Sequence, residues 1–364
     1  MPSNKNQHFV PRCHLSQFCV DENRSAIHLF NIIRDKVIYN APVKGQCSKT
    51  YFYGINLNVE KALQTIEGIY SRCIRDVLAG NFDESTAFGL KTFAVLQFFR
   101  TEAAALRSLS FMKGFVDLID PSGKDGLQAQ VWNQEQALAS SLKMMLDSEK
   151  FFEDLKPVII LNRSDADFLT SDDPAVLVNR YYAQRMKQDN FGIASSGLML
   201  CLPLTSKHYF LAFDRLVYTI EGTCNGFLET YNPRDIDSLN ELQAIKAASN
   251  VYFARKSQES YVRSIVAKST TRRKGTWVEH STFKLQSECT KQEIYVRTSP
   301  DDFSGSGTGL ISISPKYPIP SSWFSSLKFR HKPITFNNGS AVGHVRRKEW
   351  LTASGRSARR TSRL

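Results

Sequence analysis

The chain lacks the patterns on which several common protein classes depend. Its 364 residues contain no apolar run near the roughly eighteen residues that a membrane-spanning helix needs, and its first ten residues, MPSNKNQHFV, lack the apolar core of a signal peptide. The glycine-rich stretch Gly305–Gly309 lacks the lysine and the following helix of a phosphate-binding loop, and neither a Gly-x-Ser-x-Gly nor a His-Glu-x-x-His pattern occurs. ATP hydrolysis by a P-loop, serine hydrolysis of the common fold and thermolysin-like proteolysis are therefore not expected.

Cysteine is scarce and irregularly placed. The seven cysteines include no pair separated by two residues, the spacing of zinc knuckles and redox motifs, and their odd number argues against a disulfide framework. Cys73 falls on the apolar side of a predicted helix, and Cys201 falls in an apolar run. We therefore expect free, mostly buried thiols in a cytoplasmic protein.

Positive charge is concentrated in two segments. The net charge is +12, and residues 346–363 hold seven arginines or lysines against one glutamate, while residues 268–274 hold four more basic residues. Such segments attract phosphate backbones without sequence preference, but a disordered solubilising tail has the same composition. Nucleic-acid binding through residues 268–274 and 346–363 is therefore one of two interpretations.

Helical patterns dominate the first part of the chain. Residues 26–39 predict a β-hairpin, and residues 58–78 predict an amphipathic helix. A second helix begins after Asp83, a suitable N-cap, and extends to about residue 112; its middle is apolar on nearly all sides, which predicts a central, buried helix. A third helix is predicted over residues 129–152.

Strand-like runs dominate the middle of the chain. They lie at residues 157–161, 167–170, 175–178, 198–204 and 209–213. A last helix is predicted from Pro233, preceded by Asn232 as its N-cap, to about Arg255.

Because the helices and the strands are each grouped together, we expect an α+β fold, with a helix-rich core packed on a mostly antiparallel sheet. The expected division is a domain at residues 1–260, a small β-rich extension at 261–340 and a basic, disordered tail at 341–364.

The terminal stretch Gln7–Arg12 combines an imidazole, a proline and an arginine within a few positions. His8 is open to three interpretations. A histidine shortly before a proline is found in His-Asn-His nucleases, although no suitably spaced downstream Asn/His pair follows here. His8 could instead be a general base or metal ligand completed by distant carboxylates, or it could simply bond to the backbone and fix the terminus.

The stretch Thr170-Ser171-Asp172-Asp173-Pro174 follows a predicted strand. Such loops often carry functional groups, and Asp172 and Asp173 could share a divalent metal if the strand breaks at Asp172. The same residues are typical of a turn in which aspartates bond to backbone N–H groups. Both interpretations stay open.

Glu67 and Arg100 lie beside the apolar faces of the first two predicted helices. A carboxylate in such a position needs a cation or hydrogen bonds, so the two could form a structural helix–helix ion pair. Alternatively, Glu67, Gln97 and Arg100 could line a pocket closed by His8 and Asp172, where an arginine would suit a phosphate or carboxylate.

Taken together, these segments resemble a bacterial family known only as domain of unknown function 4238. The matching stretches are Gln7–Arg12 with Leu15 and Phe18, Ile66–Glu67, Gln97–Thr101, Phe168–Pro174, Pro203–Thr205 and Leu239–Asn240. The resemblance covers roughly residues 5–256 and implies a soluble bacterial protein whose motif residues form one constellation. No reaction is established for the family, and some members are suspected of acting in anti-phage defence.

Two functional hypotheses follow. The first is an enzyme, metal-dependent or not, that acts on phosphate-containing substrates such as nucleic acid or nucleotides. Its catalytic residues would be His8, Glu67 and Asp172, its substrate-binding residues Gln7, Arg12, Gln97, Arg100 and Ser171, and its metal ligands Asp172 and Asp173. The alternative is a non-catalytic module that binds nucleic acid or protein and whose polar motifs are structural.

Overall fold

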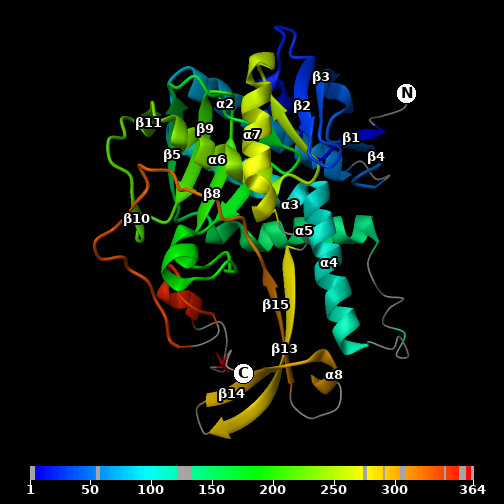
Figure 1. The fold of residues 1–364 in the computed structure, drawn as a ribbon, viewed down its shortest axis with the longest axis vertical. Helices are drawn as coiled ribbons and strands as arrows, with labels where there is room; N and C mark the ends of the chain where they lie inside the picture. The colour runs from blue at the N-terminus through cyan, green and yellow to red at the C-terminus, as the bar shows by residue number, and fades with distance from the viewer. Residues whose placement is uncertain are drawn as a thin grey trace.

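The computed structural model describes residues 5–54, 58–120, 126, 133–273, 277–289, 292–303, 309–339, 342–351 and 358–361. Within these residues, helices combine with mostly antiparallel sheets, so the chain has the predicted α+β fold (Figure 1). Six cysteines, Cys13, Cys19, Cys47, Cys73, Cys201 and Cys224, are free, and Cys73 and Cys201 are buried as predicted. No helix in the described part of the chain has the length and hydropathy needed to cross a membrane.

A five-stranded sheet forms the centre of the fold. Its strands, in spatial order, are β11 (Phe227–Thr230), β5 (Lys156–Asn162), β9 (His208–Phe213), β8 (Met199–Pro203) and β7 (Val176–Val178). Only the β11–β5 pair is parallel. Both faces are buried, because Ile159 packs in the cluster on the α3 side and Ile160 packs in the cluster on the α6 side. This explains why the strands are continuously apolar in sequence.

Four long helices precede this sheet in the chain. They are α2 (Asn58–Leu78), α3 (Glu84–Arg100), α4 (Glu102–Ile119) and α5 (Gln134–Ser148). Residues of α2, α3 and α5 pack in the apolar cluster on one face of the sheet, whereas α4 lies beside β13 (Val278–Cys289) and β15 (Gly309–Pro315) (Figure 1). The prediction for residues 58–78 is confirmed, and α3 begins after Asp83, whose carboxylate accepts from the Thr86 N–H at 2.8 Å. The predicted second helix is in fact two helices. Thr101 leaves the helical conformation, and its side-chain oxygen accepts from the Ala104 N–H as the N-cap of α4.

The third and last predicted helices also differ from the structure. Helix α5 begins at Gln134 and ends at Ser148, and residues 129–132 lie outside the described residues. Helix α6 (Pro233–Lys246) ends well before Arg255, and the chain continues as strand β12 (Asn250–Phe253). The helix stops because the carboxylate of Asp172 binds the three N–H groups that follow it.

A second sheet lies beside α6 and α7 (Glu259–Ser269). Its strands, in order, are β3 (Lys36–Pro42), β2 (Ala26–Asn31), β12 and β6 (Thr170–Ser171). The β2–β3 pair is the predicted hairpin. Of the predicted strand at 167–170, only Thr170 lies in a strand. Near the N-terminus, β1 (Asn6–His8) pairs with β4 (Ser48–Thr50), and the short helix α1 (Arg12–Leu15) follows.

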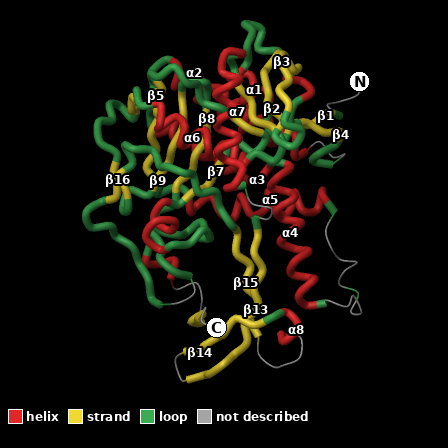
Figure 2. The backbone as a smooth tube through the Cα atoms, viewed as in Figure 1, coloured by secondary structure: helices red, strands yellow, loops and turns green. Residues whose placement is uncertain are grey.

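After α7, the chain forms a sheet that projects from the body, and it then returns to the body (Figure 1). In order, the projecting sheet has β15 (Gly309–Pro315), β13 (Val278–Cys289), β14 (Gln292–Thr298) and β17 (Ala358–Thr361), with α8 (Pro300–Phe303) beside it. Figure 2 shows β13 and β15 leaving the body together beside α4. Strands β13, β14 and β15 lie in the segment that was predicted to be rich in β-structure. Further along, β16 (Lys328–Phe329) pairs with β10 (Tyr218–Thr219).

The expected domain boundaries do not coincide with separate packing units. Helix α7 crosses residue 260 and packs on α6. Ser321 and Ser325 donate to Glu241 and Asp235 of α6, at 2.6 and 2.9 Å through their hydroxyls, so the segment between β15 and β16 lies against the body. Residues 352–357 and 362–364 of the predicted disordered tail lie outside the described residues.

Candidate functional site

The terminal motif is bonded into the fold. The buried side chain of Gln7 accepts from the Tyr53 N–H at 2.6 Å and donates to the Gly54 carbonyl at 3.3 Å, which fixes the turn after β4. The His8 ring contacts the Lys44 carbonyl at 3.2 Å. Burial lowers the pKa of His8, and the Arg12 and Arg100 guanidinium groups lower it further. The His8 ring therefore contacts the backbone, which is one of the three interpretations given for it above.

Arg100 is the centre of the first polar cluster. Its side chain is buried, and it donates to the Tyr53 hydroxyl at 3.0 Å, the His8 carbonyl at 2.8 Å and the Glu67 carboxylate at 2.8 Å. Burial alone would lower the pKa of Arg100, but Tyr53 and Glu67 raise it above its usual value. One turn earlier, buried Gln97 donates to the Phe9 carbonyl at 2.8 Å. Glu67, Gln97 and Arg100 thus meet around the backbone of the terminal motif.

Arg12 does not join this cluster. Its side chain is exposed, and it has no ion pair among the described residues. Two buried atoms of the cluster, Gln97 Oε1 and Arg100 Nη1, have no hydrogen-bond partner in the part of the chain that the structure describes.

Asp172 lies in a second, separate cluster. Its Oδ1 accepts from the Ala248 N–H at 2.8 Å, and its Oδ2 accepts from the N–H groups of Ser249 and Asn250 at 2.8 and 2.9 Å. Burial raises the pKa of Asp172 to about 6, although the three hydrogen bonds to its carboxylate act to lower this pKa. Ser171 donates to the buried Gln243 side chain at 2.9 Å. Both predicted groups therefore connect β6 to the end of α6.

Asp173 forms a buried ion cluster. It accepts from the Thr101 hydroxyl at 2.8 Å and pairs with Arg107 at 2.6 Å and with Lys246. Burial alone would raise the pKa of Asp173, but Arg107 and Lys246 hold it below its usual value. Burial, followed by the charge of Arg107, lowers the pKa of Lys246 to about 8.

The partners of Asp172 and Asp173 bear on the expectation that these two carboxylates share a divalent metal ion. The carboxylates of Asp172 and Asp173 bind different partners, backbone N–H groups in one case and cations in the other. Across the described residues, no group of three or more His, Cys, Asp or Glu is arranged to hold a metal ion. Asp173 therefore has cations in the places where a divalent ion would lie.

His14 connects the terminal motif to the loop of Asp172, a role that sequence reasoning missed. Its Nδ1 contacts the Tyr70 hydroxyl at 2.9 Å, and its Nε2 contacts the Thr170 hydroxyl at 2.9 Å. Complete burial lowers the pKa of His14 to about 3, so the ring is neutral. The sequence signal that could have identified His14 is its position next to Leu15 and two residues after Arg12, on the buried side of helix α1.

Next to the Asp173 cluster lies a cavity of about 320 Å³, which we call the α4 cavity. Residues of α3, α4, α5 and α6 and of the bases of β13 and β15 line it, and it is partly open to solvent. Its walls are mainly apolar, and its apolar lining residues include Phe98, Phe99, Phe111, Met144, Trp277 and Tyr317. Arg107 and Lys246 also line it. Sequence reasoning singled out Asp173 but not the two cations that bind it.

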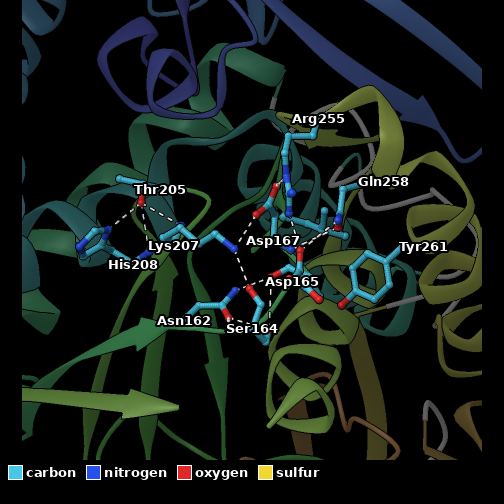
Figure 3. A network of polar contacts seen from close by, with 12 residues as sticks. Asn162, Ser164, Asp165, Asp167, Thr205, Lys207, His208, Arg255, Gln258 and Tyr261 are labelled. Carbon is cyan, nitrogen blue, oxygen red and sulfur yellow. Dashed lines mark hydrogen bonds and ion pairs between the residues drawn. The ribbon is translucent and has the colours of Figure 1, made fainter. Parts of the chain in front are cut away.

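A further polar network lies at the carboxyl end of β5 (Figure 3). The buried carboxylate of Asp167 lies between Lys207, at 3.0 Å, and Arg255, at 2.5 Å. The Thr205 hydroxyl accepts from the N–H groups of Lys207 and His208, both at 3.0 Å. An open pocket of about 930 Å³ borders this network, but none of the predicted site residues lines it. The network joins the loop after β5 to the β8–β9 turn and α7.

The two basic segments are partly built into the fold. Arg273 donates to the Ala244 carbonyl at 2.6 Å, and Arg272 pairs with Glu241 at 3.4 Å. Arg346 is fully buried. Its guanidinium group binds Asp154 and three backbone carbonyls.

Comparison with known proteins gives one match. A family model with the description "Protein of unknown function (DUF4238)" matches residues 6–257. No curated protein and no solved structure matches the chain.

Proposed function

The chain belongs to the DUF4238 family, whose description names no activity, and we propose that it is a binding module for a small, largely apolar molecule. The ligand occupies the α4 cavity. In this proposal the polar motifs hold the fold together and carry no reaction.

The α4 cavity is the observation that carries the proposal. Its volume of about 320 Å³ lies at the lower end of the range for small-molecule pockets, roughly 300–1,000 Å³. Its lining combines aromatic side chains and Met144 with a few polar groups. Apolar walls with few polar groups are the usual composition of a small-molecule site.

The partners of the motif residues support a structural role. Arg100 binds the Glu67 carboxylate, three backbone N–H groups bind Asp172, and the Lys44 carbonyl contacts His8. Glu67 and His8 lie in one cluster and Asp172 in another. The enzyme acting on phosphate-containing substrates stays a hypothesis, for which these residues would have to exchange their present partners.

Nucleic-acid binding, with or without a role in anti-phage defence, also stays a hypothesis. The basic segments offer fewer free charges than their composition indicates, because Arg273 and Arg346 donate to backbone carbonyls inside the fold. Lys268 is exposed and remains available to a phosphate.

The test uses a neutral apolar probe and two matched variants. Ser108 lines the α4 cavity, whereas Ser110, on the same helix, is exposed. We expect octan-1-ol to bind the full-length protein with a Kd at or below about 1 mM in isothermal titration calorimetry. Ser108→Phe fills the cavity and should weaken binding at least about tenfold, because the alcohol loses its apolar contacts.

Ser110→Phe adds the same ring outside the cavity and should bind like the natural protein. The proposal fails if the natural protein does not bind the alcohol, or if both variants bind it equally well.

A further inference from the structure

The charges on the walls of the α4 cavity are of one sign. Arg107, Lys246 and Lys316 line it, and no aspartate or glutamate does so among the described residues. Asp173 is fully buried and binds Arg107 and Lys246 from outside the cavity lining. A ligand in the cavity therefore contacts cations while their carboxylate partner lies behind them.

Arg107 keeps hydrogen-bonding capacity for a ligand. It donates once to Asp173, at 2.6 Å, and once to the Phe98 carbonyl, at 3.1 Å. A guanidinium group has five N–H donors, so three of them have no acceptor within the described ranges. The Arg107 side chain is 18% exposed, which leaves it reachable, in contrast to the 3% exposure of Lys246.

Two further groups extend this cationic wall. Lys316 is 24% exposed, and its ammonium group lies 3.0 Å from the Glu279 carboxylate. Tyr317 stacks on Phe191 with ring centroids 3.9 Å apart, and its hydroxyl has no hydrogen-bond partner in the described part of the chain. The charge of Arg107 acts on this hydroxyl and opposes the rise that burial causes in the pKa of Tyr317. The hydroxyl therefore lies in the field of Arg107 with its donor unused.

We infer that the ligand of the α4 cavity is an amphipathic anion, with one carboxylate or phosphate group bound by Arg107 and an apolar body against the aromatic walls. A guanidinium group binds either anion through paired N–H bonds. This inference rests on the proposed binding function and adds the class of ligand.

Part of this recognition comes from outside the family match. The match ends at residue 257, whereas Trp277, Lys316 and Tyr317 follow it in the chain. Arg107 and Lys246 lie within the matched residues. Residues after the match therefore complete the cavity and contribute to the choice of ligand.

The experiment compares four probes with the same eight-carbon chain by isothermal titration calorimetry on the full-length protein. They are octanoate, octyl phosphate, octan-1-ol and octylamine. We expect at least one of the two acids to bind about tenfold or more tightly than the alcohol, and the amine to bind more weakly than the alcohol, because the walls are cationic. The tighter of the two acids identifies the anionic group.

Two variants assign the contact. Arg107→Gln should weaken binding of the acid about ten- to hundredfold and that of the alcohol much less, because only the acid uses the charge of Arg107. Lys316→Gln should weaken the acid severalfold, and it keeps the fold because Glu279 retains its pair with Arg297 at 3.1 Å. Lys328→Gln, an exposed lysine outside the cavity, is the matched control and should change nothing.

The outcomes separate the two proposals. If the alcohol or the amine binds as tightly as both acids, the anionic ligand is refuted while the binding function stands. If Arg107→Gln and Lys316→Gln both leave the Kd of the acid unchanged, the assignment of the anion to this wall is refuted. If the alcohol does not bind, the proposed function fails, and the anionic ligand, which rests on it, fails with it.

Discussion

Replacing Arg346 by alanine should lower the free energy of unfolding far more than replacing its neighbour Arg347 by alanine. The Arg346 side chain has no exposed surface. Its guanidinium group donates to the carbonyls of Ile193 and Ser195, at 2.9 and 2.8 Å, to the Phe151 carbonyl, and to Asp154 at 3.2 Å. Alanine would leave three carbonyls without a donor, at about 1 kcal/mol or more each, and would break a largely buried ion pair. The expected loss in the free energy of unfolding is about 3–5 kcal/mol.

Arg347 is the matched control because it has the same charge at the next position. Its side chain is 39% exposed, and its ion pairs with Asp154 and Glu349 measure 3.7 and 3.8 Å. Surface pairs of this kind contribute little, so Arg347→Ala should lower the free energy of unfolding by less than about 1 kcal/mol.

Urea unfolding followed by circular dichroism measures both losses, with comparable m-values required for the comparison. Equal losses in the two variants would refute the reasoning, because Arg346 would then be part of a solvated tail and would not hold residues 342–351 on the body.

Three further predictions concern the motif clusters. The pKa of His14 is about 3 in the folded chain and 6.5 in the unfolded chain, so the unfolded state binds the additional proton. Stability should therefore fall by up to about 5 kcal/mol between pH 6.5 and 3, and urea titrations over that range should show a smaller pH slope in His14→Gln. Asp172→Ala removes the acceptor of three backbone N–H groups and should destabilise the fold by about 3 kcal/mol. The specific readout is faster hydrogen exchange at residues 248–250, and unchanged exchange there would contradict the capping role. Asp173→Asn should destabilise by about 3–5 kcal/mol because Lys246 and Arg107 lose their buried counter-ion, and adding Lys246→Met should restore part of the loss. A strictly additive double variant in urea unfolding would show that the ion cluster is not coupled.

Elements that depend on their own residues were predictable. Helix α2 has the predicted bounds because its apolar stripe at the helical period lies within the segment itself. The start of α3 followed from Asp83, since an N-cap bonds only two or three residues ahead. The β2–β3 hairpin depends on neighbouring residues in the same way.

Elements that depend on distant residues could not be predicted from the sequence. Nothing near Lys246 signals the end of α6, and the predicted helix continued to Arg255. The acceptor that ends it is the carboxylate of Asp172, more than seventy positions earlier. The break at Thr101 had a local signal, a threonine that caps the next helix, but the apolar pattern continued across it.

The sequence by itself determined the α+β class, the positions of several helices and of the central strands, and some of the polar residues that are drawn into the fold. Glu67 and Arg100 were singled out because polar groups beside apolar helix faces must find partners, and Asp172 and Asp173 because they follow a predicted strand. Only the tertiary structure decided which partners they have. Arg107 and Lys246 reach Asp173, and His14 reaches Thr170, from segments far apart in the chain. The α4 cavity exists for the same reason, since its walls come from α3, α4, α5, α6 and two strands beyond residue 276, and such a cavity depends on packing between segments that no local pattern records.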